Sequence, residues 1–94
     1  MMVIQWTNTA REEYRSILQS AYDLSLDSAL ELDEQLEVLQ DRLLIFKNLC
    51  PPHPEIPTFR RCVVTKTVAL IYDLTETTII IIAVIDTRSN HPLN

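Results

Sequence analysis

Hydrophobic residues change their spacing halfway along this 94-residue chain. From residue 9 to residue 48 they recur every three to four positions, which is the period of an amphipathic α-helix. From residue 59 onwards they form short alternating or continuous runs, which are typical of β-strands. The pattern therefore predicts a helical first half and a β-sheet second half.

A short strand and two helices are expected in the first half. Residues 3–7 form the strand, and Thr9 with Glu12 then has the spacing of a capping box, which marks a helix start. Ser28 with Glu31 repeats this spacing, so we expect a second helix at about 28–48 and a connecting linker at 22–27, together making an antiparallel hairpin. The apolar stripes are Ala10, Tyr14, Ile17, Leu18 and Ala21 in the first helix and Leu32, Leu36, Leu39, Leu43 and Phe46 in the second.

A proline-rich segment separates the two halves. Four of the five prolines lie at 51–57 and end the second helix, because proline has no backbone N–H to donate. Strands are then predicted at 59–65, 68–74 and 78–86, joined by hairpin turns. The order predicts one α+β domain covering residues 1–94, in which the N-terminal helical hairpin packs on one face of a small antiparallel sheet in the order β-α-α-β-β-β.

The last predicted strand is apolar at every position from 79 to 85. Successive strand residues point to opposite faces, so Ile80, Ile82 and Val84 are expected on one face and Ile79, Ile81, Ala83 and Ile85 on the other. Two helices can cover only one of these faces, and an uncovered apolar row marks an interaction site. We therefore expect the isolated chain to be poorly soluble or to self-associate, with Ile80, Ile82 and Val84 as candidate partner-binding residues.

Charge divides the chain in the same place. Residues 1–58 carry ten acidic and four basic side chains, whereas residues 59–94 carry three and four, and the total is −5. Because acidic surfaces repel phosphates, only the strand half could contact a polyanion. Its candidates are Arg60, Arg61, Lys66 and Arg88. Arg60 and Arg61 are expected on opposite faces of their strand, and Arg88 could pair locally with Asp86 instead.

Cysteine content and the N-terminus suggest the compartment. The chain begins without a basic region followed by an apolar core, so we expect a cytoplasmic protein with Cys50 and Cys62 reduced. Cys50 and His53 are metal-ligand types but lack the paired pattern of a zinc site, so neither a metal nor a cofactor is expected. The longest apolar run is far shorter than the roughly 20 residues that span a bilayer, which argues against a membrane partner.

Four stretches of the sequence resemble the ParE/RelE superfamily of type II toxin-antitoxin toxins. They are VIQWTNTA at the start, FRRCVV, LIYDL and the closing IIAVIDTRSNHP, whose DTRSNHP end is similar to the ParE, or plasmid stabilisation, branch. The resemblance implies a bacterial toxin that poisons DNA gyrase without being an enzyme. It also implies a cognate antitoxin as partner, which could cover the second apolar row of the sheet; a homodimer is the fallback.

Two alternatives remain open from the sequence. A RelE-like nuclease cuts mRNA on the ribosome and needs cations and a proton-transfer group, roles open here to Arg60, Arg61, Arg88 and His91. The third-strand arginine of such nucleases is replaced by Ala69, however, and a second basic position by Cys62. The other alternative is a protein-binding module that keeps the fold but is not toxic.

Overall fold

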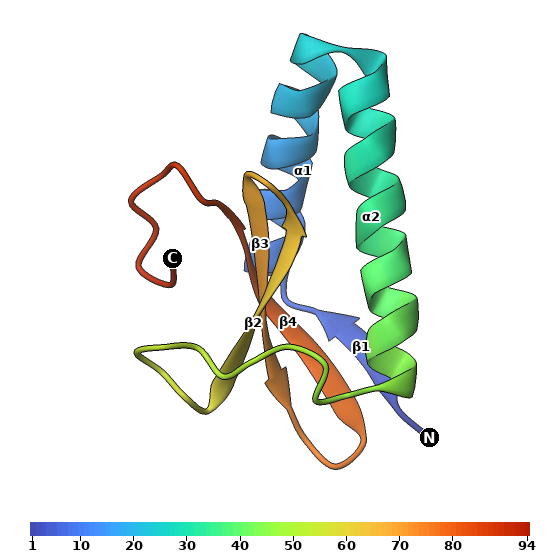
Figure 1. Ribbon diagram of the computed structural model, residues 1–94, viewed down its shortest axis with the longest axis vertical. Helices are drawn as coiled ribbons and strands as arrows, with labels where there is room; N and C mark the ends of the chain where they lie inside the picture. The colour runs from blue at the N-terminus through green and yellow to red at the C-terminus, as the bar shows by residue number, and fades with distance from the viewer.

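The computed structural model describes all residues from Met1 to Asn94 and confirms the predicted order of elements (Figure 1). Strand β1 (Val3–Trp6) leads into helices α1 (Asn8–Leu24) and α2 (Leu26–Ile45). Strands β2 (Phe59–Thr65), β3 (Val68–Leu74) and β4 (Thr78–Asp86) follow, with the bounds that the sequence predicts. None of the helices is long and apolar enough to cross a membrane.

Both helices begin earlier than the capping-box signals indicate. The hydroxyl of Thr7 accepts a hydrogen bond from the N–H of Ala10 at 3.1 Å, and the hydroxyl of Ser25 accepts one from Ser28 at 3.0 Å. Thr7 and Ser25 are the residues with extended backbone, so their side chains reach the free amides of the first turn. Ser25 also ends α1, and the predicted linker at 22–27 is therefore wrong because one extended residue makes the turn.

The sheet has the order β1-β4-β3-β2 and contains one parallel pair. β3 pairs with β2 and with β4 in antiparallel fashion, as expected for hairpins. β1 instead runs parallel to β4, which the helical hairpin makes possible because it carries the chain back across one face of the sheet. The predicted antiparallel sheet is therefore mixed, and β4 is a central strand.

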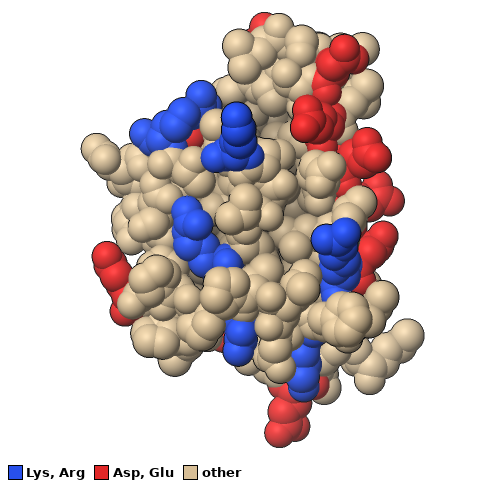
Figure 2. All heavy atoms as spheres, in the orientation of Figure 1, with Lys and Arg blue, Asp and Glu red and all other residues tan.

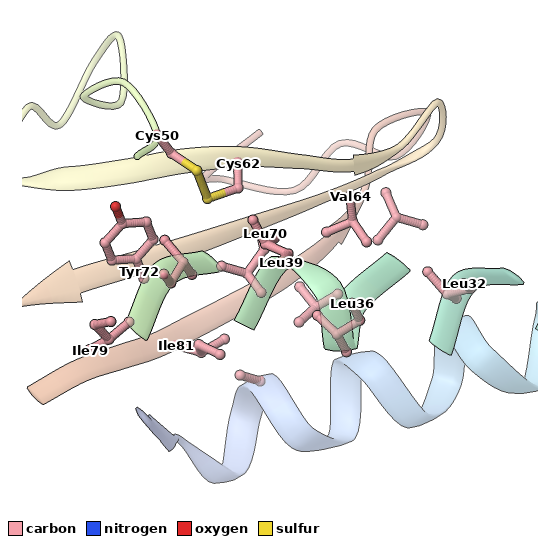
Figure 3. Packing of buried hydrophobic residues seen from close by; sticks show 14 residues of the cluster. Leu32, Leu36, Leu39, Cys50, Cys62, Val64, Leu70, Tyr72, Ile79 and Ile81 are labelled. Atoms are coloured by element: carbon pink, nitrogen blue, oxygen red, sulfur yellow. A yellow bond between two sulfur atoms is a disulfide. The ribbon is translucent and has the colours of Figure 1, made fainter. Parts of the chain in front are cut away.

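The helices pack on one face of this sheet and form the main core with it (Figure 3). Leu36, Leu39 and Leu43 of α2 are buried against Leu70 of β3 and Ile81 of β4. Tyr72 also lies in this core, and its hydroxyl donates a hydrogen bond of 2.6 Å to the carbonyl of Lys47, just after α2. Burial raises the pKa of the Tyr72 phenol. The hydrogen bond joins the end of α2 to the middle of the sheet.

A bulge in β4 interrupts the alternation of side chains that the sequence predicts for this strand. Tyr72 pairs with Ile81 and Ile71 pairs with Ala83, so Ile82 is an extra residue between them. Beyond the bulge the faces are exchanged, and Val84 is buried in the main core under the helices. The prediction that Val84 shares a face with Ile80 is therefore wrong, because one inserted residue reverses every later position of a strand.

The second face of the sheet is largely covered by the chain itself. Ile71, Ala83 and Ile85 are each at most 1% exposed, and they form a separate small cluster. Leu93 from the C-terminal tail packs against this cluster, as do Phe59 and Ile82. The tail folds back beside the sheet, on the side away from α2 (Figure 1). The expected open row is therefore reduced to the half-buried Ile80 and Ile82.

A buried histidine holds this tail in place. His53 is 2% exposed, and its Nε2–H donates a hydrogen bond of 2.7 Å to the carbonyl of Leu93. Its Nδ1 accepts hydrogen bonds from the N–H groups of Glu55 and Ile56 at 3.1 and 3.2 Å. Every polar atom of the ring therefore has a partner, and the proline segment and the tail are joined over the second face of the sheet.

A disulfide attaches the proline segment to β2, contrary to the expectation of reduced thiols. Pro52 forms a β-bridge with Arg60, and Cys50 is bonded to Cys62 with their Cα atoms 5.2 Å apart (Figure 3). Both cysteines lie in the main core. The sequence could not indicate this pairing, because it depends on the proline segment running back along the edge of β2.

The disulfide leads to a prediction about stability. Closing a loop with a sequence separation of 12 restricts the unfolded chain, so the double variant Cys50→Ala/Cys62→Ala should lose about 3 kcal/mol of unfolding free energy. Urea unfolding with and without a reducing agent measures the loss. The reducing agent should lower the midpoint of the wild-type chain and leave that of the double variant unchanged. Equal midpoints for the wild-type chain and the double variant without the reducing agent would contradict the prediction.

Candidate interaction surface

Arg60 is held by the backbone that follows α2. Its Nη1 donates hydrogen bonds to the carbonyls of Cys50 and Asn48, at 2.6 and 3.4 Å. The side chain is half-buried beside Tyr72, its cross-strand neighbour. These contacts use the guanidinium to satisfy loop carbonyls, so Arg60 has a structural role and is poorly placed to bind a target.

Arg61 points to the opposite side of β2, as predicted from the alternation of strand residues. Its Nη2 donates a hydrogen bond of 3.2 Å to the side-chain oxygen of Asn94. The amide nitrogen of Asn94 in turn donates to the carbonyls of Thr87 and Ser89, at 2.9 and 3.0 Å. Arg61 therefore helps to fold the C-terminal tail and remains partly exposed beside it.

Arg88 forms the local pair with Asp86 that the sequence left open. Its Nε and Nη2 contact the two carboxylate oxygens at 3.0 and 2.9 Å, and its backbone N–H donates to the same carboxylate. These hydrogen bonds hold the pKa of Asp86 below its usual value and raise that of Arg88. Any stabilisation from this exposed pair is small, is present above the unfolded pKa of Asp86 and is lost as the pH falls.

Lys66 and Arg88 line the same cleft, which has a volume of about 470 Å³. The cleft lies between the helical hairpin and the turn that joins β2 to β3. Lys66 is exposed and takes part in no ion pair. The acidic side chains of Glu31 and Asp86 also line the cleft, together with hydroxyl-bearing residues at Ser16, Ser20, Ser28, Thr65 and Thr67. The structure thus brings two of the four candidate cations together, in a cleft of mixed charge.

His91 is engaged at both ring nitrogens. Its Nε2 lies 2.6 Å from Oε2 of Glu13 on α1, and its Nδ1 accepts a hydrogen bond of 3.1 Å from the N–H of Leu93. The other oxygen of Glu13 accepts from the N–H of Val84 at 3.2 Å. This arrangement joins α1, β4 and the tail, and it leaves neither nitrogen of His91 open to a substrate.

The uncovered part of the second sheet face is mainly apolar. Ile80 and Ile82 are half-buried there, and Val3 of the neighbouring β1 is 47% exposed. Gln5 pairs with Ile80 and is also exposed. We call Val3, Ile80 and Ile82 the apolar sheet patch.

Charge is unevenly distributed over the surface. In Figure 2, Asp and Glu gather along the right edge, over the upper part of α2, whereas Lys and Arg are scattered over the rest of the face in view. No group of three or more His, Cys, Asp or Glu side chains is arranged to hold a metal ion. The face shown in Figure 2 therefore has scattered cations and a concentration of acidic side chains over α2.

Sequence reasoning missed two residues that organise this surface. Glu13 was not singled out, although it contacts both His91 and the backbone of β4. His53 was considered only as a metal-ligand type, whereas it holds the tail. Their partners lie 78 and 40 positions away, and no local pattern marks such contacts. His53 is buried and Glu13 is half-buried, and neither property is visible before the chain is folded.

Solved structures confirm the architecture. The chain is similar to one from the chromosomal ParDE toxin-antitoxin system of P. aeruginosa, with a TM-score of 0.69 and 17% identity over 92% of this chain and 96% of that one. It is also similar to YafQ from E. coli strain BL21(DE3), with a TM-score of 0.63 and 17% identity over 94% and 96% of the two chains. The E. coli DinJ–YafQ complex contains a further match, with a TM-score of 0.64, the same identity and the same coverage. At this identity the likeness establishes the fold.

The family follows from the sequence itself. No curated protein sequence is significantly similar to the chain. The family model described as the ParE toxin of the type II toxin-antitoxin system, parDE, matches residues 4–91, which include all of both helices and of β2, β3 and β4, and β1 from its second residue. The chain therefore belongs to the ParE toxin family of type II toxin-antitoxin systems.

Proposed function

We propose that this ParE-family chain inhibits growth by acting on DNA gyrase without being an enzyme, and that a cognate antitoxin neutralises it. The observation that carries the proposal is the engagement of both ring nitrogens of His91. A nuclease would need this group for proton transfer. Ala69, which replaces an arginine of RelE-like nucleases, is 0% exposed, and Arg60 is occupied with loop carbonyls. The catalytic set is therefore incomplete.

The cellular target can be tested with the purified chain. We expect it to trap gyrase on DNA in a supercoiling and cleavage assay and to leave mRNA intact on translating ribosomes. His91→Ala should retain this activity, because the histidine serves to join α1 and the tail. Loss of toxicity in His91→Ala with unchanged thermal unfolding, or ribosome-dependent mRNA cleavage, would overturn the proposal in favour of a nuclease. A chain that does neither would be the non-toxic binding module.

The exposed cations of the strand half are our candidates for the target contact. Lys66→Ala and Arg88→Ala should each reduce growth inhibition while changing the unfolding free energy by less than about 1 kcal/mol, because both side chains are exposed. Arg61→Ala should also reduce growth inhibition, but it should cost about 1 kcal/mol of unfolding free energy because it removes the hydrogen bond to Asn94. Arg60→Ala should instead destabilise the chain by about 1–3 kcal/mol, because it leaves the Cys50 carbonyl without its charged donor.

Arg15→Ala is the matched control for these variants. Arg15 is exposed on α1 and lies outside the strand half. Growth assays with inducible expression, together with urea unfolding of each purified variant, separate toxicity from stability. Full toxicity in the combined variant Lys66→Ala/Arg88→Ala would exclude the cleft from the target contact.

The apolar sheet patch is our candidate for antitoxin binding, with Ile80 and Ile82 as its centre. Val84 no longer belongs to this group, because it is buried under the helices. Apolar anchors in such patches contribute most of the binding energy of an interface. An antitoxin segment laid over Val3, Ile80 and Ile82 would extend the cover that the tail provides for the rest of this face.

Ile80→Asp should weaken binding of the cognate antitoxin by at least about tenfold, since a charge would be buried in the interface. Val63→Asp is the control, because Val63 is 71% exposed at the opposite edge strand. Isothermal titration calorimetry with the purified antitoxin measures both variants. Equal affinities for Ile80→Asp, Val63→Asp and the wild type would place the antitoxin elsewhere.

A further inference from the structure

The turn end of the helical hairpin carries large apolar side chains that no other element covers. Tyr22, Leu26 and Leu30 are 58%, 55% and 58% exposed. The two helices extend past the end of the sheet, and their turn lies at the far end of the molecule (Figure 1). Exposed apolar side chains that lie close together mark a contact surface.

A hydrogen bond between the two helices shows that these side chains are neighbours. The hydroxyl of Tyr14 on α1 donates to the carboxylate of Asp33 on α2 at 2.6 Å, so these sides of the helices adjoin. Tyr22 lies about two turns after Tyr14, on nearly the same side of α1. Leu26 and Leu30 lie on the side of α2 that carries Asp33. We call Tyr22, Leu26 and Leu30 the hairpin-tip patch.

The backbone at the tip is held in one conformation. Ser25 alone joins the two helices, and its N–H donates to the carbonyl of Ala21 at 3.1 Å. Its hydroxyl accepts from the N–H of Ser28 at 3.0 Å and donates to the hydroxyl of Ser28 at 2.8 Å. A patch on such a short connection has little backbone freedom to lose when a partner binds.

The charged side chains around the patch are acidic. Between Arg15 and Arg42 the chain has seven acidic side chains and no basic one. Arg15 is the nearest cation of the helices, and it lies about two turns before Tyr22, away from the turn. The helix dipoles add little, because the C-terminal end of α1 and the N-terminal end of α2 meet at the tip with opposite partial charges. The acidic residues are Asp23, Asp27, Glu31, Asp33, Glu34, Glu37 and Asp41, and all are exposed.

We propose that the hairpin-tip patch binds a segment of a partner protein that presents apolar side chains flanked by Lys or Arg. The apolar side chains of this segment pack on Tyr22, Leu26 and Leu30 and supply most of the affinity. Its cations face Asp23 and Asp27, which follow directly after Tyr22 and Leu26 in the chain. Complementary charge speeds the encounter and selects against partners of the wrong sign.

Other occupants fit the patch less well. Two copies of the chain meeting tip to tip would bring the acidic side chains of both together, which costs free energy. The same carboxylates repel a nucleic acid or an anionic membrane. Ile45 and Phe46 are also exposed, at the other end of α2, but they lie between Arg42 and Lys47, which repel a basic segment.

The patch is separate from the surfaces assigned to the target and the antitoxin. None of its three residues lines the cleft that contains Lys66 and Arg88. The apolar sheet patch lies on the face of the sheet away from the helices. The inference therefore stands independently of gyrase and of the antitoxin, and its failure would leave the proposed function unchanged.

A labelled synthetic peptide tests the chemistry of the partner. It contains only leucine and lysine, with the leucines at helical spacing, and fluorescence anisotropy measures its binding to the purified chain. We expect binding that weakens as the salt concentration rises, and no binding of a peptide with glutamate in place of lysine. Equal binding of the two peptides, or no binding of the lysine peptide, would overturn the proposal.

Apolar variants test the location. Leu26→Ser/Leu30→Ser should weaken binding of the lysine peptide by at least about tenfold, because it removes the apolar contacts. Ile45→Ser/Phe46→Ser is the matched control, since these side chains are 73% and 60% exposed at the other end of α2, and it should bind like the wild type. Urea unfolding checks that both variants are folded. A loss of affinity in both double variants, or in neither, would contradict the assignment to the tip.

Charge variants test the role of the carboxylates. Asp23→Asn/Asp27→Asn keeps the shape of both side chains and should weaken binding by about fivefold, the effect of two exposed ion pairs. Glu55→Gln/Glu76→Gln removes the same charge from exposed positions outside the hairpin and should leave the affinity unchanged. Equal weakening in the two double variants would mean that the peptide responds only to net charge, and the proposal would fail.

Discussion

The fold depends on the need to cover β4 from both sides. This strand is apolar from residue 79 to residue 85 and lies between β1 and β3, so it has neighbours at both edges and both of its faces must be shielded from water. The helical hairpin covers one face. The other face is covered by the C-terminal tail, which is fixed to the proline segment through His53. The tail therefore contributes to the core, although it has no regular secondary structure.

This arrangement explains why a chain of 94 residues can contain a strand buried on both faces. Segments that lack the regular backbone hydrogen bonds of a helix or strand need other contacts to remain ordered, because fixing each residue costs conformational entropy. The Cys50–Cys62 disulfide and the β-bridge between Pro52 and Arg60 supply these contacts for the proline segment. The pair of His91 and Glu13 supplies them for the tail. Each contact joins segments that are distant in sequence, and together they replace a second layer of helices.

Helices and strands with a regular pattern of apolar residues were predictable from the sequence. Contacts between residues far apart in the sequence were not. The bounds of β2, β3 and β4 follow from their apolar runs and the turns between them. The start of α2 was misplaced because Ser25 and Ser28 are equally good capping residues, and only backbone conformation decides between them. The bulge at Ile82 gave no signal in a run where every residue is apolar, so the faces of Ala83, Val84 and Ile85 were exchanged.

The candidate cations show the same difference between what the sequence predicts and what only the folded chain reveals. This difference affects which target the chain can bind. The sequence marks four cations of the strand half as candidates, but it could not show that Arg60, Arg61 and Arg88 are bound to groups of the chain itself. Lys66 is the one candidate cation without such a partner in the fold. Affinity for nucleic acid grows with the number of phosphates that a protein neutralises, and a chain with a net charge of −5 also repels them. A protein target makes no such demand, because shape and apolar contact can supply most of its binding energy. The electrostatics of the folded chain thus favour a protein over an RNA as its main contact.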